Sequence, residues 1–490
     1  MLESPARSVA EPSTAVAHRP VRTDAGAAPA RPRALRTSRM TRRETLVVSA
    51  SILASVLLGA LIGERHGFFD LSVYYGAVNY WTHTPGVSIY DFITPQSTYG
   101  FTYPPFAAIV MLPFALMEWH VAIVVTCVAI VAATLAVLFW FVAPLARRHG
   151  WNLWYAMGIA VAIAIAFDPL RETFLFGQVN MYLVAMVGFD LLVLTARNSR
   201  FSGVGIGLAT AIKLTPGVFI VYLLVTKRWR AALTASAAAA GATLVGAAFT
   251  PDASRVFFTD ALWNTDRVGQ TAFISNQSLN GAVSRLNYLD PSTTLWIVSV
   301  VLVLAIWAVR VRRAVQAGDE RTGFALTGVV TCLISPITWI HHLVWVMPAL
   351  MLLVGHAFDA SPKRRRMVWG ITAFSFVVLA SRLAWAYDNR WYHGFLLWFM
   401  SNAYVWICLL LLVTVPVPAA IRAGQRADQP RTLDLDRALA NLLASQRLAG
   451  LVRRLGLSDQ LERVQLSMLW RREPVAAVSF TEREIVRPPQ

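Results

Sequence analysis

The chain has 490 residues, of which 56% are hydrophobic and only 14% are charged, whereas a soluble globular protein carries about a quarter charged residues. The apolar residues fall in blocks of about 12–25, the length of a bilayer-spanning helix, so the composition excludes a soluble protein and predicts an all-α polytopic membrane protein. The net charge of +17 would suggest nucleic-acid binding in a soluble chain. In a membrane protein, Lys and Arg accumulate in the cytoplasmic loops, which explains the positive charge, and we expect no nucleic-acid partner.

Residues 1–43 carry nine Arg, several Pro and Ala, and no apolar periodicity. They predict a disordered, basic cytoplasmic tail. A signal peptide is the alternative, but the basic region is too long and no small-residue cleavage site follows it. Only three of the 44 basic residues are Lys, and this preference for Arg is typical of a high-GC, actinobacterial genome.

The following segment, 44–417, is the predicted transmembrane domain. Its three cysteines lie in apolar stretches without metal-ligand spacing, and we expect no disulfide. About twelve spans are predicted if the short apolar blocks are counted: 44–63, 121–145, 152–167, 179–196, 202–213, 216–226, 231–249, 293–310, 323–340, 342–357, 368–385 and 396–417.

The distribution of basic residues predicts the orientation. With the N-terminus in the cytoplasm, five short inner loops hold fifteen basic residues, and the longer outer segments hold seven. Because Lys and Arg accumulate on the cytoplasmic side, this asymmetry predicts that both termini are cytoplasmic.

Two apolar stretches are too short for ordinary spans. The basic segments 196–200 and 226–230 both belong inside, yet only about 25 residues separate them. A hairpin of two half-spans, bent at "AIKLTPG" (211–217), satisfies both. The stretch 105–117 is read as an interfacial or re-entrant helix, since a full span there would turn the later arginines outward.

The C-terminal segment, 418–490, predicts a basic cytoplasmic tail. Within it, residues 433–457 have the apolar spacing of an amphipathic helix. Such a helix would lie on the inner membrane surface, and a solvated helix is the alternative.

Five polar motifs stand out from the apolar background: Asp70 with "TYPPF" (102–106), "DPLRETFLFGQVN" (168–180), "AIKLTP" (211–216), the segment 258–286, and "SPITWIHHLVW" (335–345). The spans were placed without these motifs, yet all five fall on the outer face. Segments that are distant in sequence are therefore expected to converge in an active site that faces the periplasm.

Each motif also has a simpler structural interpretation. Asp70 follows the first apolar helix by about two turns, where its carboxylate would simply be exposed to water. The "GQVN" segment would form a turn and cap the next helix. His341 and His342 would lie at the membrane interface. Lys213 is harder to explain in this way, because a Lys at a membrane bend needs a counter-charge or a water-filled cavity.

The residue types narrow the chemistry. The sequence has no Gly-rich nucleotide loop, no Walker motif and no paired metal-ligand spacing. Carboxylates, cations, amides and hydroxyls suit a sugar and a phosphate. Because nucleotide-sugars are not normally available outside the cytoplasm, the phosphate is expected to arrive on a lipid.

The five motifs, with "DLSVY" after the first span, resemble glycosyltransferase family 87 of the GT-C superfamily, and in particular the mycobacterial α-(1→2)-mannosyltransferases that use polyprenyl-phosphate-mannose. The resemblance covers roughly residues 44–417. It implies a GT-C fold with about twelve spans, extracytoplasmic catalytic loops and an acidic residue in the first outer loop. Differences at positions 71–72 and in "SLNG" leave the acceptor open, as either a phosphatidylinositol mannoside or the lipomannan or lipoarabinomannan backbone.

The resemblance also implies the roles. Asp70 is expected to act as the general base in an inverting transfer to a mannosyl 2-hydroxyl. The departing phosphate needs positive charge, and we expect no cofactor and no dedicated metal site. The candidates for phosphate binding are Lys213, His341, His342 and Arg285, and those for sugar contacts are Gln178, Asn180, Asn276, Gln277 and Tyr103.

Other functions were weighed against this one. A transporter or flippase for a lipid-linked sugar would place functional groups on both faces and show inverted repeats, and neither is seen. A scaffold would not need its polar motifs on one face. Among enzymes, transfer of another lipid-linked sugar such as arabinofuranose is the alternative. The expected partners are polyprenyl-phosphate-mannose, a glycolipid acceptor and membrane lipids.

Overall fold

The computed structural model describes residues 34–62, 66–95, 97, 99–264, 269–288, 290–387 and 394–417. Most of the predicted N-terminal tail and the whole of 418–490, including the predicted amphipathic helix, lie outside these ranges. The described residues are mainly helical, and Arg36 before the first helix pairs in an isolated bridge with Asn152.

The α-helices are α1 (Arg42–Ile62), α2 (Phe69–His83), α3 (Pro105–Met111), α4 (Trp119–His149), α5 (Leu153–Ala166), α6 (Asp168–Phe176), α7 (Asn180–Phe189), α8 (Val204–Ile212), α9 (Val218–Val225), α10 (Trp229–Phe249), α11 (Pro251–Val256), α12 (Leu279–Ser284), α13 (Thr293–Gln316), α14 (Glu320–Ile334), α15 (Met347–Asp359), α16 (Pro362–Ala380), α17 (Phe395–Ser401) and α18 (Ala403–Thr414). Short 3₁₀ or π turns connect them: η1 (Ile89–Asp91), η2 (Leu112–Leu116), η3 (Asp190–Leu194), η4 (Thr195–Arg197), η5 (Thr215–Gly217), η6 (Phe257–Ala261), η8 (Ile340–Val346) and η9 (Trp385–Tyr387).

Every predicted apolar block coincides with a helix, but the predicted count of about twelve spans is not confirmed. Within the described ranges, six helical runs are long and apolar enough to cross a membrane: α1, α4, α7 with η3 and η4, α10, α13, and η8 with α15. The count rises to eight if the bent pairs α5–α6 and α17–α18 are each one span. Helices α8, α9 and α14 are too short, and α16 begins with the charged run 363–366, so these four of the predicted blocks are not among the spans.

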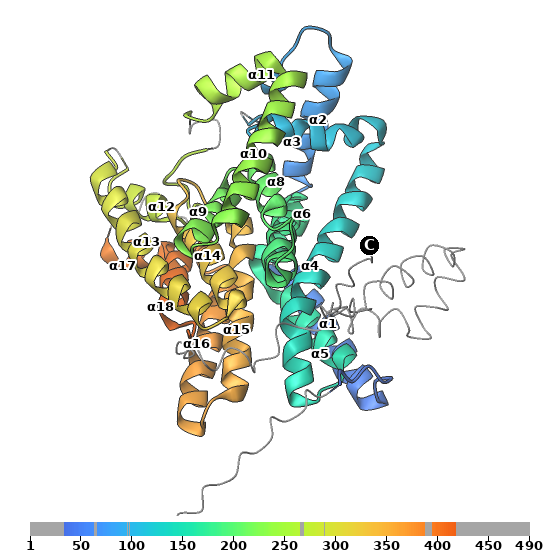
Figure 1. Cartoon of the computed structure of the whole chain (residues 1–490), viewed down its shortest axis with the longest axis vertical. Coiled ribbons are helices and arrows are strands. Elements are labelled where there is room, and N and C mark those ends of the chain that lie inside the picture. Colours follow the sequence, from blue (N-terminus) through green and yellow to red (C-terminus); the bar gives the residue numbers. More distant parts are fainter. Residues whose placement is uncertain are drawn as a thin grey trace, which may run out of the picture.

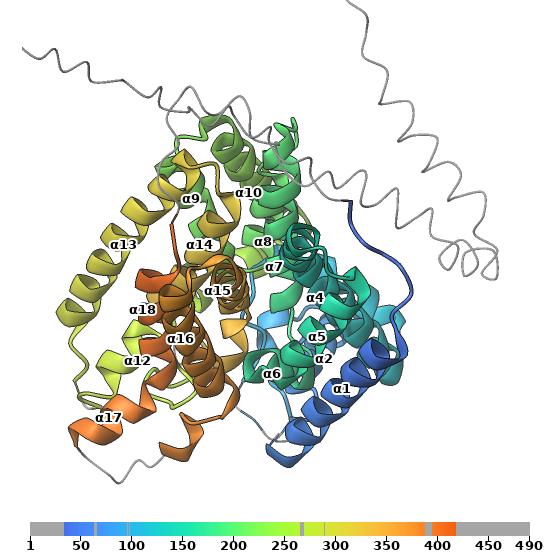
Figure 2. The same cartoon turned by 90° about the horizontal axis from the view of Figure 1, so that it is seen from below.

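The helices form a bundle around α14, which is buried along nearly its whole length from Thr322 to Leu333. Seen from below, α14 and α15 lie inside the bundle, with α1 and α13 at opposite edges (Figure 2). Helix α1 has little buried surface and exposes large apolar side chains. A helix of this kind is suited to face lipid.

The loops rich in basic residues are tied together on one side of the bundle. Arg148 at the end of α4 pairs with Asp359 at the end of α15. Arg228 before α10 pairs with Glu320 at the start of α14, and the adjacent Arg321 donates to a backbone carbonyl of α4. Helices α2, α3 and α11 lie at the top in Figure 1, away from the turn between α15 and α16.

The predicted hairpin is present. Helices α8 and α10 run in parallel with touching backbones: a Cβ on Gly203 would lie 2.2 Å from the Ala231 carbonyl, and one on Gly207 2.3 Å from the Ala235 carbonyl. Two helices that run in the same direction start on the same side, so the chain between them must turn back. It does so at η5, within 211–217, as the basic loops predict.

A glycine fixes the start of α2 against the end of α6. Gly177 ends α6 with φ +69°, and a Cβ there would lie 2.7 Å from Leu71 Cβ. Phe68 N–H donates to the Leu175 carbonyl at 3.0 Å. This contact holds the first turn of α2, which carries Asp70, beside the residue that follows Gly177, namely Gln178.

Candidate active site

The five polar motifs meet at one cavity of about 440 Å³. Its walls are the first turn of α2, the segment 99–104 before α3, the α6–α7 junction, the bend after α8, η6 with the residues around it, and the segment 335–342 after α14. Segments as distant in sequence as the first turn of α2 and residues 335–342 are therefore brought together, as the sequence predicts.

Asp70 lies on the cavity wall. Its side chain is half-buried, and its Oδ2 atom is buried without a hydrogen-bond partner among the described residues. Burial raises the pKa of Asp70 from 3.8 to about 6, while Gln178 and Lys213 act in the opposite direction. The carboxylate is therefore ionised at neutral pH and has a free oxygen, as a general base requires.

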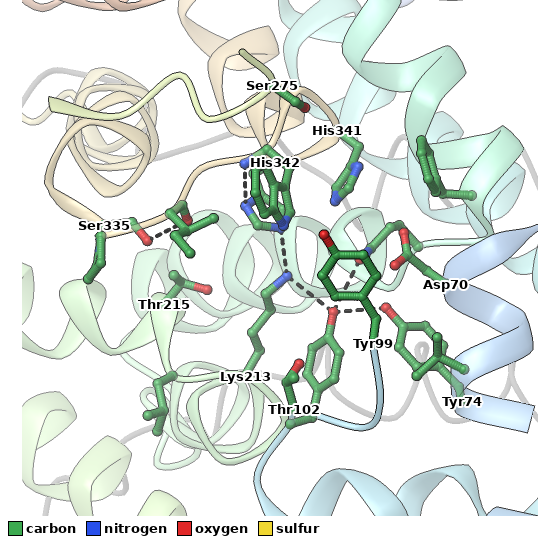
Figure 3. Close-up of a pocket in the computed structure, with 18 of the residues that line it drawn as sticks. Asp70, Tyr74, Tyr99, Thr102, Lys213, Thr215, Ser275, Ser335, His341 and His342 are labelled. Atoms are coloured by element: carbon green, nitrogen blue, oxygen red, sulfur yellow. Dashed lines mark hydrogen bonds between the residues drawn. The ribbon is translucent and has the colours of Figure 1, made fainter. Parts of the chain in front are cut away.

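Lys213 lies in the break between α8 and η5 and is held by three partners. Its Nζ atom donates to Asn180 Oδ1 at 3.0 Å and to Tyr103 Oη at 3.3 Å, and it lies 3.0 Å from His342 Nε2. Figure 3 shows Lys213 and Asp70 approaching the cavity from different elements, with Tyr99 between them in this view. Thus Asn180 and Tyr103, predicted to contact sugar, both accept hydrogen bonds from Lys213 in the empty cavity.

Tyr103 connects the lysine to the side of the cavity that holds the carboxylate. Its hydroxyl donates to Gln178 Oε1 at 3.3 Å and lies 2.8 Å from Tyr74 Oη. The Gln178 side chain in turn hydrogen-bonds Asp70. Tyr103 and Gln178 thus form a chain of polar contacts between Lys213 and Asp70.

His341 and His342 occupy neighbouring positions with different surroundings. His342 contacts Lys213, whereas His341 Nε2 is buried and has no hydrogen-bond partner in the described part of the chain. The His341 carbonyl accepts hydrogen bonds from Thr173 Oγ1 at 2.9 Å and Asn180 Nδ2 at 3.3 Å. The backbone of η8 is thus fixed to α6 and α7, and the His341 ring remains available to a ligand.

A second carboxylate, Glu172, lines the cavity but is already neutralised. Its Oε1 atom accepts from Arg382 Nη1 at 2.6 Å and lies 3.0 Å from His66 Nε2. Arg382 also lies 3.6 Å from Asp168, which pairs with Arg171. Because Arg382 bridges both carboxylates, this cluster is suited to hold α6 and the end of α16 together.

Three candidates predicted from sequence lie outside the lining of the cavity. Asn276 uses its amide on the Thr271 and Pro336 carbonyls and on Thr338 N–H, and Gln277 bonds the Ile274 and Ser401 carbonyls and Tyr404 N–H. Arg285 donates to Asn402 Oδ1 and to the carbonyls of Phe273 and Asn276. All three hydrogen-bond backbone groups of the irregular segments behind the cavity.

Aromatic residues of the cavity were missed from sequence, namely Phe69, Tyr99, Phe273, Trp339 and Trp385. Trp339 lies next to the two histidines, which was an available signal. The others are indistinguishable by sequence from ordinary interfacial aromatics. In the structure they supply flat apolar surface beside the polar groups, the kind of surface against which sugar rings pack.

The polar groups of the cavity define its chemistry. Within the described ranges, no group of three His, Cys, Asp or Glu side chains has an arrangement that could hold a metal ion. What the site offers is an ionised carboxylate with a buried free oxygen and, separately, a cluster of one lysine and two histidines. A base and a cluster of nitrogen groups that can bind a phosphate, in one cavity, suit displacement of a phosphate by a hydroxyl.

Comparison with known proteins gives a consistent result. The model of glycosyltransferase family 87 matches residues 101–336. No solved structure matches the chain.

Two curated relatives are similar over most of their length. A Mycolicibacterium smegmatis protein named polyprenol-phosphate-mannose-dependent alpha-(1-2)-phosphatidylinositol pentamannoside mannosyltransferase is 32% identical, covering 79% of this chain and 94% of the relative. A Mycobacterium tuberculosis protein named polyprenol-phosphate-mannose-dependent alpha-(1-2)-phosphatidylinositol mannoside mannosyltransferase is 34% identical, covering 62% of this chain and 74% of the relative. The resemblance seen in the motifs is therefore confirmed, and the chain belongs to glycosyltransferase family 87.

Proposed function

We propose that this glycosyltransferase moves mannose from polyprenyl-phosphate-mannose to a mannosyl 2-hydroxyl of a phosphatidylinositol mannoside, forming an α-(1→2) linkage. The observation that carries the proposal is the cavity, which holds Asp70 on one wall and Lys213 with His342 on another. The names of the relatives supply the donor and the class of acceptor.

The reaction is a single displacement. The acceptor oxygen attacks the anomeric carbon while Asp70 takes the hydroxyl proton, and the bond from that carbon to the phosphate oxygen breaks. An α product formed in one displacement requires a β-linked donor. Glu172 is a poor candidate for a covalent nucleophile, because Arg382 and His66 already compensate its charge.

The leaving group is a phosphate that gains one negative charge as it departs. Lys213, His342 and His341 are the groups of the cavity that can stabilise this charge. The free Nε2 atom of His341 provides a contact to either the phosphate or the transferred sugar. The aromatic walls are suited to hold the sugar rings.

We also propose that the cavity opens on the extracytoplasmic side of the plasma membrane and that both termini are cytoplasmic. Support comes from the basic loops, which are joined by the Arg148–Asp359 and Arg228–Glu320 pairs away from the cavity. The positive-inside rule places such loops in the cytoplasm.

The test uses the full-length protein in vesicles with labelled polyprenyl-phosphate-mannose and a series of phosphatidylinositol mannosides of increasing size. The expected product carries one added mannose that an α-(1→2)-specific mannosidase releases. Polyprenyl-phosphate-arabinofuranose serves as the competing donor. Transfer of arabinofuranose in place of mannose would refute the donor assignment, and movement of label between leaflets without a product would indicate a flippase.

A further inference from the structure

The hydrogen bonds around Lys213 specify a protonation state, because each atom there has a defined capacity to donate or accept. Trp339 N–H donates to His342 Nδ1 at 3.2 Å. A backbone N–H cannot accept a proton, so Nδ1 must present its lone pair. A neutral imidazole carries one proton, which must then lie on Nε2.

That proton is directed at Lys213, whose Nζ atom lies 3.0 Å from His342 Nε2. An ammonium group has three donors and no lone pair, and it cannot accept this hydrogen bond. An uncharged amine has one lone pair and two N–H groups. These match the three partners, since the amine accepts from His342 and donates to Asn180 Oδ1 and Tyr103 Oη.

We propose that the hydrogen bond from His342 favours the uncharged amine form of Lys213 in the empty cavity, and that binding of the donor phosphate to this form brings a proton from solvent onto Lys213. This inference rests on the proposed function, since it concerns the same phosphate site. His342 acts here as a positioning residue, because the tautomer set by Trp339 N–H decides what Lys213 can accept.

The surroundings of Lys213 favour this coupling. The titratable groups that face it are Asp70 on α2, Tyr103 before α3, Cys332 on α14, and His341 and His342 on η8. Burial lowers the pKa of Lys213 to about 8, although the Asp70 carboxylate acts in the opposite direction. Once formed, the ammonium would lie 5.1 Å from the centre of the Tyr103 ring, a favourable position for a cation.

The coupling has a clear physical advantage. A charged lysine in a cavity of a membrane protein is costly until an anion joins it. If proton and phosphodiester enter together, the cavity gains no net charge on binding. The positive charge is then present when the phosphate departs and acquires its second negative charge.

The opposite tautomer is the alternative. With its proton on Nδ1, His342 could donate to the nearby Ile337 carbonyl and accept from a charged Lys213. That arrangement would set the Trp339 N–H and the His342 N–H against each other at 3.2 Å, which disfavours it. The two tautomers predict different proton balances on binding.

The test is isothermal titration of the purified full-length protein with farnesyl methyl phosphate, a phosphodiester that has no titrating proton of its own. Titrations at pH 7 and at pH 9 in buffers of different ionisation enthalpy give the number of protons taken up. We expect this number to approach about one per ligand at pH 9 and to fall below about half at pH 7. The affinity should weaken by up to tenfold per pH unit above pH 8.

Two variants locate the proton. Lys213→Arg keeps a permanent charge and should bind without proton uptake and without this pH dependence. His342→Gln offers a carbonyl to a charged lysine and should reduce the uptake while binding persists. The exposed His83→Gln is the matched control and should behave as wild type.

The outcomes separate this inference from the proposed function. Binding by the wild-type protein without proton uptake at pH 9 would overturn the inference and leave the phosphate site intact. Proton uptake that persists in Lys213→Arg would also overturn it. If farnesyl methyl phosphate does not bind at all, the assignment of the phosphate site, and with it both proposals, fails.

Discussion

Replacing Asp70 with Asn separates catalysis from folding. The amide is nearly isosteric with the carboxylate but cannot take the acceptor proton, so transfer should fall by roughly 10²–10⁴-fold. The thermal stability of the variant, in contrast to its activity, should stay the same or rise. The pKa of Asp70 is raised from 3.8 to about 6, and each pKa unit corresponds to about 1.36 kcal/mol, so the ionised carboxylate costs the fold up to roughly 3 kcal/mol at pH 7.5.

The sign of this stability effect follows from linkage. A group whose folded-state pKa is raised contributes its stability below the unfolded-state pKa, near 4, and loses it as the pH rises through about 6. Asp70→Asn should therefore unfold at the same or a higher temperature than wild type at pH 7.5, and the difference should shrink toward pH 4. Intrinsic tryptophan fluorescence follows unfolding, and labelled-mannose transfer follows activity.

The matched control is Asp252→Asn, which removes an exposed carboxylate on α11 outside the cavity. It should leave transfer within about twofold of wild type. Activity of Asp70→Asn within a few-fold of wild type would refute the role of Asp70 as the base. A large loss of thermal stability in Asp70→Asn would instead show that the carboxylate is structural.

Three further predictions follow from the same geometry. The rate of transfer at low donor concentration should fall tenfold per pH unit below about pH 6, because Asp70 becomes protonated there. A rate that does not change between pH 5 and 7 would contradict this prediction. Lys213→Met should still insert into the membrane, but its donor KM should rise and its kcat should fall. The control Lys227→Met, at an exposed position, should leave both kinetic constants unchanged. Failure of Lys213→Met to insert would make Lys213 a structural residue. A cysteine at Thr215, which lines the cavity, should react with an impermeant thiol reagent from outside the cell, and one at Trp229 should not; the reverse pattern would invert the topology.

Much of the site was predictable because polar residues are expensive in an apolar chain. Asp70, Lys213 and the two histidines stand alone in apolar surroundings, so each needed a partner or a ligand. The bend after α8 was predictable for a related reason, since two basic segments could not lie on opposite sides.

Other parts could not be read from the sequence. Asn276, Gln277 and Arg285 have the same side chains as sugar- and phosphate-binding residues, yet irregular backbone also needs such groups to satisfy its carbonyls. In the fold, all three hydrogen-bond backbone groups behind the cavity, which the sequence does not reveal. Likewise, an apolar block does not reveal whether its helix will be long enough to span, as the short helices α8 and α9 show.

The central claim is that one cavity holds the base and the phosphate site on the two sides of the anomeric carbon. The most direct measurement is a structure of the full-length Asp70→Asn protein with farnesyl-phosphate-mannose bound. The phosphate should lie within hydrogen-bond distance of Lys213 Nζ and His342 Nε2, with the anomeric carbon turned toward residue 70. A phosphate bound at Arg382 or Arg171, or a sugar that lies away from residue 70, would contradict the claim.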